Sequence, residues 1–332
     1  MTKTAWLFPG QGSQHPEMMA DLLTAYPPAK ERCEQAAAIL GWSVIDCCAG
    51  SIGNLDQTLY TQPSLFLVES LLVDALKERG AKADFVAGHS LGEYVALYAA
   101  EVFDFETGLK LVQRRAALMN AAGGGKMVAL IGFDRQELQQ AIASTPNVVL
   151  ANDNHPGQVV ISGLPAAVDT VVGKIKVKRA VPLNVSGAFH SPLMAEAAAT
   201  FATLLDECQF QAAVFPVLNN VEPEPTTDAA LIKARLRSQM TGSVRWVDTC
   251  HALAAAGVTQ ALEIGPGNVL AGLVKRTTPE ITVTSVWPRS PVWRAWCESR
   301  SRAFHQPAPL PSLQMVSGES TPAHLFSGAH LW

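Results

Sequence analysis

The sequence lacks the features that mark membrane, secreted and nucleic-acid-binding proteins. No uncharged apolar run approaches the roughly 18 residues of a membrane-spanning helix. The opening Met-Thr-Lys leads into an expected strand, without the apolar core of a signal peptide. The net charge of −4 comes without a dense basic stripe, which argues against binding to nucleic acid. We therefore expect neither a membrane span nor a nucleic-acid partner.

Paired cysteines and phosphate-binding glycine loops are also missing. The six cysteines include no C-x-x-C pair, and Cys47 and Cys48 are adjacent, so their spacing fits neither a disulfide framework nor a zinc site. Neither G-x-G-x-x-G nor a P-loop occurs. The simplest expectation is a protein of the reducing cytoplasm with no metal site and no nucleotide loop.

What the chain does have is the mixture of strands and helices typical of an α/β fold. With 332 residues, 48% of them hydrophobic and 16% charged, it is long enough for one large core or two smaller ones. Strands are expected over residues 4–8, 85–87, 215–219, 260–264 and 281–284, and helices over residues 17–40, 64–79, 91–100, 106–122, 192–208, 228–240, 244–256 and 268–276.

A different pattern occupies the middle of the chain. Strands and helices there follow the order βαββαβ, with strands over residues 126–133, 148–151, 158–162 and 179–185 and helices over residues 135–144 and 165–174. This order within about sixty residues is the ferredoxin-like pattern. We predict a large α/β-hydrolase-like domain with a parallel sheet, formed by residues 1–125 and 186–286, into which a small ferredoxin-like domain of residues 126–185 is inserted.

The last part of the chain, residues 287–332, changes character. Four of the seven tryptophans fall there, among Pro, Ser, Arg and His without a repeating pattern. We expect this tail to be an extension outside the fold, either disordered or the product of a changed reading frame.

Ser90 stands at the centre of Gly88-x-Ser90-x-Gly92, between an expected strand and an expected helix. The glycines suit a tight strand-to-helix turn in which the two backbones crowd together. Such a turn exposes the serine hydroxyl and places the Leu91 N–H at the first turn of a helix, where amides are unpaired. The motif indicates either an acyl-transfer nucleophile or an ordinary glycine-rich connection.

Arg115 lies on the apolar stripe of the helix expected over residues 106–122, with Leu111, Val112, Leu118 and Met119 three and four residues away. A buried arginine keeps its charge and needs a planar anionic partner. That partner is either an internal carboxylate, in a salt bridge, or the carboxylate of a substrate.

Two further residues are candidates for the same site. His190 follows the exit from the predicted inserted domain, where a cleft between domains would open. It is the best placed of the eight histidines to act as the base that a serine nucleophile needs, although a structural role is the alternative. Gln11 lies between Gly10 and Gly12, which indicates either a close backbone approach or a plain turn.

Six motifs occur together and in order over about residues 3–285: Phe8-Pro-Gly-Gln-Gly-Ser-Gln14, Gly88-His-Ser-Leu-Gly-Glu-Tyr94, Gln113-Arg-Arg115, Gly187-Ala-Phe-His-Ser191, Gln239 with Ser243-Val-Arg-Trp246, and Glu263-Ile-Gly-Pro-Gly267. This joint pattern resembles the malonyl-CoA:acyl carrier protein transacylase family of bacterial-type fatty acid synthesis. One departure is Asn268, where the family more often has lysine.

The resemblance implies roles for the catalytic groups. Ser90 would attack the thioester and carry the malonyl group, and His190 would act as base and then acid. The backbone carbonyl of Gln239 would orient His190 in place of an acidic third residue. The backbone N–H groups of Gln11 and Leu91 would form the oxyanion hole.

The resemblance also implies how the substrate is selected. Arg115 would bind the free carboxylate of malonate, while Phe189 and Leu91 would exclude an α-methyl branch. The substrates would be malonyl-CoA and holo-acyl carrier protein, used by a monomer in a ping-pong reaction without a metal or redox cofactor.

Three other functions are alternatives to this one. A discrete acyltransferase serving a polyketide synthase would use the same site with a different partner. A serine hydrolase would use water as acceptor, but it would gain nothing from a cation in its acyl pocket. A catalytically silent subunit conflicts with the presence of Ser90, His190 and Arg115 together.

Overall fold

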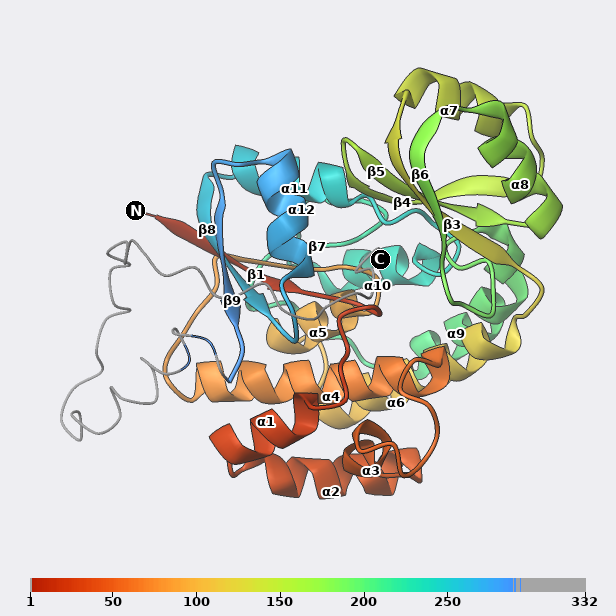
Figure 1. Cartoon of the computed structure of the whole chain (residues 1–332). Helices are drawn as coiled ribbons and strands as arrows, with labels where there is room; N and C mark the ends of the chain where they lie inside the picture. Colours follow the sequence, from red (N-terminus) through yellow and green to blue (C-terminus); the bar gives the residue numbers. More distant parts are fainter. Residues whose placement is uncertain (1, 289, 291–292, 294–332) are drawn as a thin grey trace.

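The computed structural model describes residues 2–288, 290 and 293. Its centre is a five-stranded parallel sheet in the order β7-β2-β1-β8-β9 (Figure 1). The strands are β1 (Lys3–Phe8), β2 (Phe85–Gly88), β7 (Val217–Leu218), β8 (Val258–Ile264) and β9 (Thr282–Val286).

Helices cover both faces of this sheet, because the buried strand β1 is apolar on both sides. Trp6 and Phe8 face the core formed with α4, α5 and α6, whereas Ala5 and Leu7 face α11 and α12. The helices of this parallel unit are α1 (Met18–Ala25), α2 (Ala29–Leu40), α3 (Val44–Cys48), α4 (Thr58–Lys77), α5 (Gly92–Ala99), α6 (Phe105–Ala121), α9 (Ala195–Glu207), α10 (Ala229–Ser238), α11 (Trp246–Ala255) and α12 (Val269–Thr277). A short 3₁₀ turn, η1 (Pro192–Met194), precedes α9.

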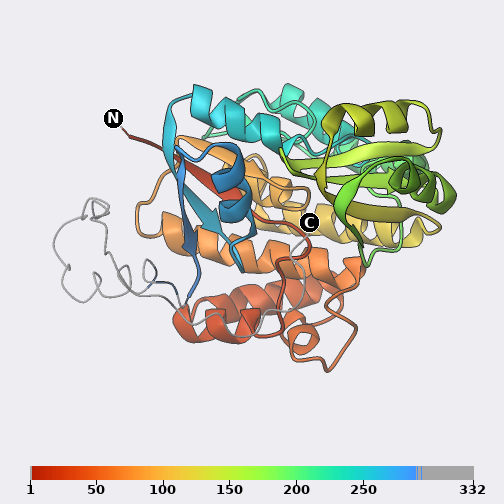
Figure 2. The ribbon, with the colours of Figure 1, turned by 45° about the horizontal axis from the view of Figure 1, so that its top comes forward.

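A separate four-stranded antiparallel sheet lies beside the parallel unit, with helices α7 and α8 packed on it (Figures 1 and 2). Its strand order is β4-β5-β3-β6, and it has an apolar core of its own. The elements of this antiparallel unit are β3 (Lys126–Phe133), α7 (Arg135–Ala143), β4 (Val148–His155), β5 (Gln158–Gly163), α8 (Pro165–Lys174) and β6 (Val177–Pro182). The expected α/β fold with a parallel sheet is confirmed.

The two units are joined by more than the chain crossovers. Asn152 of β4 forms an isolated parallel bridge with Val244, just before α11. The Val244 N–H donates to the Ala151 carbonyl at 2.8 Å, and the Asp153 N–H donates to the Val244 carbonyl at 2.9 Å. Val244 of the parallel unit therefore continues the hydrogen bonding of the smaller sheet.

The limits of two strands in the antiparallel unit were predicted wrongly. Strand β4 continues to His155, through residues expected to form a loop, because β4 pairs with β5 up to the two-residue turn Pro156-Gly157. Strand β6 begins at Val177 and ends at Pro182, instead of spanning residues 179–185, because Val177 pairs with Phe133 of β3.

Helix α4 also differs from expectation. It begins at Thr58, six residues before the predicted start, and contains Pro63. The first helical turns are buried, including Thr61 and Gln62. Packing of this segment therefore outweighs the local cost of a proline that removes one hydrogen-bond donor.

The folded part of the chain extends beyond the predicted limit at residue 286. The Trp287 ring meets the His15 ring edge-on with centroids 5.3 Å apart. The side chain of Trp293 is 2% exposed and lies 5.4 Å from the Arg79 guanidinium. Trp287 and Trp293 thus contribute contacts to the fold, whereas residues 289, 291–292 and 294–332 of the predicted tail lie outside the described residues.

Candidate active site

The strand-to-helix turn of residues 88–92, hereafter the nucleophile turn, joins β2 to α5. Ser90 has a φ of 51°, a left-handed conformation that non-glycine residues seldom adopt. A Cβ on Gly88 would stand 1.9 Å from the carbonyl carbon of Gly92, and a Cβ on Gly92 would stand 2.1 Å from the Phe8 carbonyl oxygen. Only glycine fits at either position, so both are steric requirements of the turn.

An asparagine that follows β7 holds this turn in place. Asn220 accepts a hydrogen bond from the Ser90 N–H at 2.8 Å through Oδ1, and its Nδ2 donates to the Gly88 carbonyl at 2.6 Å. The turn is thereby fixed on both sides of the serine.

His190 lies against the serine hydroxyl, with Nε2 2.8 Å from Ser90 Oγ. Its Nδ1 lies 3.0 Å from the carbonyl oxygen of Gln239 and 3.1 Å from that of Gly242. Because carbonyl oxygens only accept, the hydrogen resides on Nδ1, and the Nε2 lone pair faces the serine. Burial, followed by the charge of Arg115, lowers the pKa of His190 to about 3. A neutral imidazole is the form that can accept the serine proton.

Arg115 of α6 reaches the same hydroxyl from the other side. Its Nη2 donates to Ser90 Oγ at 3.1 Å and its Nη1 donates to Gln62 Oε1 at 2.7 Å. The guanidinium lies 5.3 Å from the centre of the Tyr94 ring and is fully buried. Burial lowers the pKa of Arg115. Of the two alternatives for Arg115, the internal salt bridge is not formed: no carboxylate of the described residues pairs with this cation.

Two backbone N–H groups near the serine are free to bind an anion. Gln11 follows β1, and Leu91 is the residue before α5. Neither amide donates a hydrogen bond within the described part of the chain. The two segments lie close together, since a Cβ on Gly10 would stand 2.5 Å from the His89 carbonyl oxygen.

The predicted residues meet in one narrow cavity. It is lined by Gln11, Gln62, His89, Ser90, Leu91, Met119, Met127, Asn152, Phe189 and His190. Arg115 reaches Ser90 from α6, and Gln239 contacts His190 through its backbone, so all seven predicted site residues gather here. His89 also lines the cavity, and its ring packs against that of Trp246 with centroids 5.6 Å apart.

Several residues of the site had not been singled out from the sequence. Gln62 holds Arg115, Asn220 holds the nucleophile turn, and Met127 and Asn152 reach the cavity from the antiparallel unit. Asn219 and Asn220 follow an apolar strand of a parallel sheet directly, and polar residues at the carboxyl ends of such strands are a usable signal. Gln62, Met127 and Asn152 carry no comparable local signal.

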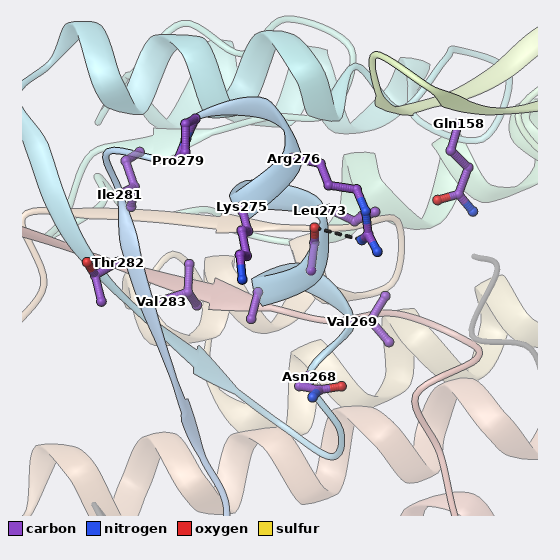
Figure 3. Close-up of a pocket in the computed structure, with 12 residues that line it drawn as sticks. Gln158, Asn268, Val269, Leu273, Lys275, Arg276, Pro279, Ile281, Thr282 and Val283 are labelled. Carbon is purple, nitrogen blue, oxygen red and sulfur yellow. Dashed lines mark hydrogen bonds between the residues drawn. The ribbon is translucent and has the colours of Figure 1, made fainter. Parts of the chain in front are cut away.

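A wider groove runs beside α12 and strand β9, with Gln158 of β5 on its far wall (Figure 3). Lys275 and Arg276 lie along it, and Arg276 Nη1 donates to the Gly272 carbonyl at 2.9 Å. The groove shares Val269 with a small cavity that in turn shares Gln11 and His89 with the cavity of Ser90. Asn268, the departure from the family pattern, lines the groove without capping α12.

The described residues contain neither a candidate membrane-spanning helix nor a candidate metal site. None of the helices in the described part of the chain is both long and apolar enough for a membrane span. No group of three or more His, Cys, Asp and Glu side chains among the described residues is placed to hold a metal ion.

Comparisons with known proteins identify the family of the chain. The family model described as "Acyl transferase domain" matches residues 5–292. A malonyl CoA-acyl carrier protein transacylase of Synechocystis sp. is 52% identical over 284 residues, covering 86% of this chain and 97% of the relative. The crystal structure of the Synechocystis transacylase superposes with a TM-score of 0.84 over the same shares of the two chains.

Two further relatives come from polyketide biosynthesis. A polyketide biosynthesis malonyl CoA-acyl carrier protein transacylase of Bacillus subtilis is 40% identical, covering 82% of this chain and 96% of the relative. A malonyl-transacylase solved in complex with a type II polyketide acyl carrier protein is 36% identical, with a TM-score of 0.84, and the match covers 90% of this chain and all of that one. With an acyl transferase domain over most of its length and these relatives, the chain belongs to the malonyl-CoA:acyl carrier protein transacylase family of acyltransferases.

Proposed function

We propose that this enzyme transfers a malonyl group from malonyl-CoA to the phosphopantetheine thiol of a holo-acyl carrier protein and thereby supplies fatty acid synthesis. The observation that carries the proposal is the position of Ser90 Oγ, which lies 2.8 Å from the base His190 and 3.1 Å from the cation Arg115. A nucleophile beside a fixed positive charge suits an acyl group that ends in a carboxylate.

In the first half-reaction Ser90 Oγ attacks the thioester carbonyl while His190 Nε2 takes the hydroxyl proton. The carbonyl oxygen becomes an oxyanion that the backbone N–H groups of Gln11 and Leu91 bind. Collapse of the tetrahedral intermediate breaks the carbon–sulfur bond, and His190 returns the proton to the departing CoA thiolate. The malonyl group remains as an ester on Ser90.

In the second half-reaction the carrier thiol takes the place of CoA. His190 accepts the thiol proton, the thiolate attacks the malonyl ester, and the proton passes to Ser90 Oγ as the ester bond breaks. One thioester replaces another, so the reaction needs no metal or redox cofactor. The carbonyls of Gln239 and Gly242, which lie 3.0 and 3.1 Å from Nδ1, would hold the ring in position through both steps.

Substrate selection is assigned to three side chains. Arg115 would bind the free carboxylate, with Gln62 keeping the guanidinium in place at 2.7 Å. Phe189 and Leu91 are buried walls of the cavity, and would exclude a branched acyl group at a cost of about 1–3 kcal/mol.

The groove beside α12 is the proposed route for the thiol end of both substrates. Its support is the run of shared lining residues, Val269 and then Gln11 and His89, that leads from the groove to Ser90. Lys275 and Arg276 line the groove and are suited to the phosphate groups of CoA or of a carrier-bound arm.

The domain organisation is also part of the proposal. We assign residues 126–185 to a ferredoxin-like domain inserted into an α/β-hydrolase-like domain of residues 1–125 and 186–286. The βαββαβ order of the segment and the strand order β4-β5-β3-β6 support the assignment. A cytoplasmic location remains our expectation, since five cysteines of the described residues are free thiols. The expectation of a monomer rests on the family resemblance alone.

Mass spectrometry tests the proposed reaction. After mixing with malonyl-CoA, the protein should carry a malonyl adduct on Ser90, and the Ser90→Ala variant should carry none. Addition of holo-acyl carrier protein should remove the adduct faster than water does. Rapid loss to water, with no malonylated carrier, would identify a serine hydrolase instead.

A polyketide carrier is the second candidate acceptor, because relatives at 40% and 36% identity belong to polyketide systems. Transfer rates measured in parallel with a fatty-acid carrier and a polyketide carrier decide between them. We expect the fatty-acid carrier to have the higher kcat/KM, and the reverse order would assign the enzyme to polyketide synthesis.

A further inference from the structure

A fully buried carboxylate lies directly behind the nucleophile turn. Glu93 is in the first turn of α5, three residues after Ser90, and is 0% exposed. Its oxygens accept hydrogen bonds from Asn219 Nδ2 at 2.7 Å, from Gln239 Nε2 at 2.8 Å and from the Asn220 N–H at 3.2 Å. Burial raises the pKa of the Glu93 carboxyl, and the hydrogen bonds from Asn219, Gln239 and Asn220 act in the opposite direction. All three partners are donors, so the ionised carboxylate, which only accepts, is the form that satisfies them.

Each of two partners also contacts a reacting residue. The Gln239 side chain donates from the same Nε2 to the Ser90 carbonyl at 2.8 Å, and the backbone carbonyl of Gln239 lies 3.0 Å from His190 Nδ1. The Asn220 side chain accepts from the Ser90 N–H at 2.8 Å. Glu93 is therefore bonded to the residues that fix both the serine backbone and the imidazole.

The electrostatic setting makes this carboxylate more than a packing group. Backbone carbonyls, which are uncharged, are the only Nδ1 partners of His190 in the described residues. Arg115 is a buried cation without an ion-pair partner among those residues, and its charge disfavours a protonated His190. A buried negative charge behind Gln239 opposes that effect when the imidazole becomes positive during the reaction.

We propose that Glu93 is a positioning residue that acts through the side chains of Gln239 and Asn220 to fix the nucleophile turn and the orientation of His190. It supplies a negative charge that the Ser90–His190 pair lacks, and Gln239 stands between this charge and the imidazole. The proposal deepens the proposed function and rests on it.

The chain offers a matched control in Glu69 of α4. Glu69 is also 0% exposed, but neither of its carboxylate oxygens has a hydrogen-bond partner among the described residues. Burial raises the pKa of Glu69 well above its usual range, so Glu69→Gln measures the loss of a buried carboxyl outside the network. Glu93→Gln removes the same type of side chain from the network around Ser90.

The kinetic test measures formation of the malonyl enzyme in a single turnover. We expect Glu93→Gln to lower the acylation rate at least 10-fold with less than a 3-fold change in the half-saturating malonyl-CoA concentration, and Glu69→Gln to change neither by more than 2-fold. A loss confined to substrate affinity, or an equal loss in both variants, would overturn the proposal.

A spectroscopic readout is independent of turnover. In protein labelled with ¹⁵N-histidine, and with His190 assigned by comparison with His190→Gln, the wild type should show one tautomer with hydrogen on Nδ1. Glu93→Gln should show a mixture of tautomers. If the wild type forms no malonyl-Ser90, the proposed function fails while this measurement still tests Glu93. An unchanged single tautomer would overturn the role of Glu93.

A second variant keeps the test valid if Glu93→Gln does not fold. Gln239→Met removes the side-chain link to Glu93 and leaves both the backbone carbonyl and the carboxylate. We expect it to reproduce the rate loss and the mixed tautomer. Where both variants fold, their effects on the rate should be strongly non-additive in the double variant, and simple additivity would contradict action through Gln239.

Discussion

Ser90 and His190 both adopt left-handed backbone conformations, with φ of 51° and 56°. Each such residue costs on the order of 1–3 kcal/mol and persists only where its surroundings hold it. Around Ser90 those surroundings are Asn220, Gln239 and the two obligatory glycines; around His190 they include the carbonyls that flank Nδ1. Contacts among distant segments of the chain thus maintain the reactive geometry.

Replacing Arg115 with alanine should remove the selectivity for a carboxylate-bearing acyl group. Because charge-assisted hydrogen bonds contribute about 1.5–3 kcal/mol, kcat/KM for malonyl-CoA should fall roughly 10- to 150-fold. The kcat/KM for acetyl-CoA should change far less, so the preference for malonyl-CoA over acetyl-CoA should decrease. Arg114→Ala, at the exposed neighbouring position, is the control. Unchanged malonyl kinetics in the Arg115 variant would contradict the assigned role.

The value of kcat/KM for acylation should fall only at an unusually low pH. Acylation needs neutral His190, whose pKa burial and Arg115 lower to about 3 from the ordinary 6.5. We therefore expect kcat/KM for acylation to stay level from pH 7 down to about pH 5, where an ordinary histidine would already be mostly protonated. A half-loss near pH 6.5 would show that the imidazole is not buried in solution.

The same shift carries a consequence for stability. Between about pH 3 and pH 6.5 the unfolded chain binds a proton at His190 that the folded chain does not. Stability from this residue therefore rises with pH through that window and is lost as the pH falls below 6.5.

Some site residues were predictable from local sequence signals, and others depend on contacts between distant parts of the chain. Ser90 was predictable because five consecutive residues, 88–92, form the motif of its turn. Arg115 was predictable because its charge lies on an otherwise apolar helix face. Phe189 and Gln239 came only from the family resemblance, whereas the local pattern singled out Gln11 and Leu91 and the resemblance supplied their role. Gln62 and Asn220 act across 53 and 130 residues of sequence, and single-residue patterns do not reveal such pairs.

At the scale of elements, the junction of β2 with α5 is the most constrained. Gly92→Ala should destabilise the protein by about 3 kcal/mol or more, because the added methyl would overlap the Phe8 backbone. Gly173→Ala is a matched control in helix α8, where nothing lies within 4 Å of the added carbon. It should stabilise the protein by about 0.5–1 kcal/mol. Urea unfolding of both variants measures the difference, and similar values would refute the steric argument.

The elements themselves were largely predictable, and their limits were less so. Helix α8 and strand β3 have the bounds expected from sequence, since proline and clear alternation mark them. The end of β4 was missed because Asn152 and Asn154 are polar yet buried, and the start of α4 because packing retains Pro63 within the helix. Tertiary contacts decide such boundaries.

At the scale of the whole molecule, the cavity is shared between two units. The parallel unit supplies Ser90 and its partners, and the antiparallel unit supplies Met127 and Asn152. Sequence periodicity predicted the parallel and antiparallel elements, but their relative placement depends on contacts such as the bridge from Asn152 to Val244.

The end of the folded region can be tested by truncation. A chain ending at Ser285 lacks buried Val286 and Trp293, which a chain ending at Trp293 retains. Because loss of a buried tryptophan side chain costs about 3–5 kcal/mol, the shorter chain should be less stable by at least that amount in chemical unfolding. Equal stability of the two truncated chains would support the predicted end of the folded region at residue 286.

The bridge between β4 and Val244 links motion to chemistry. Gly242, two residues before this bridge, is one of the two carbonyl acceptors for the His190 ring. A swing of the smaller sheet that opened the cleft for a bulky thioester would pull on this tether and loosen the imidazole at the same time. Such an opening would therefore weaken the support of the ring, and full support would return only with the bridge between Asn152 and Val244 closed.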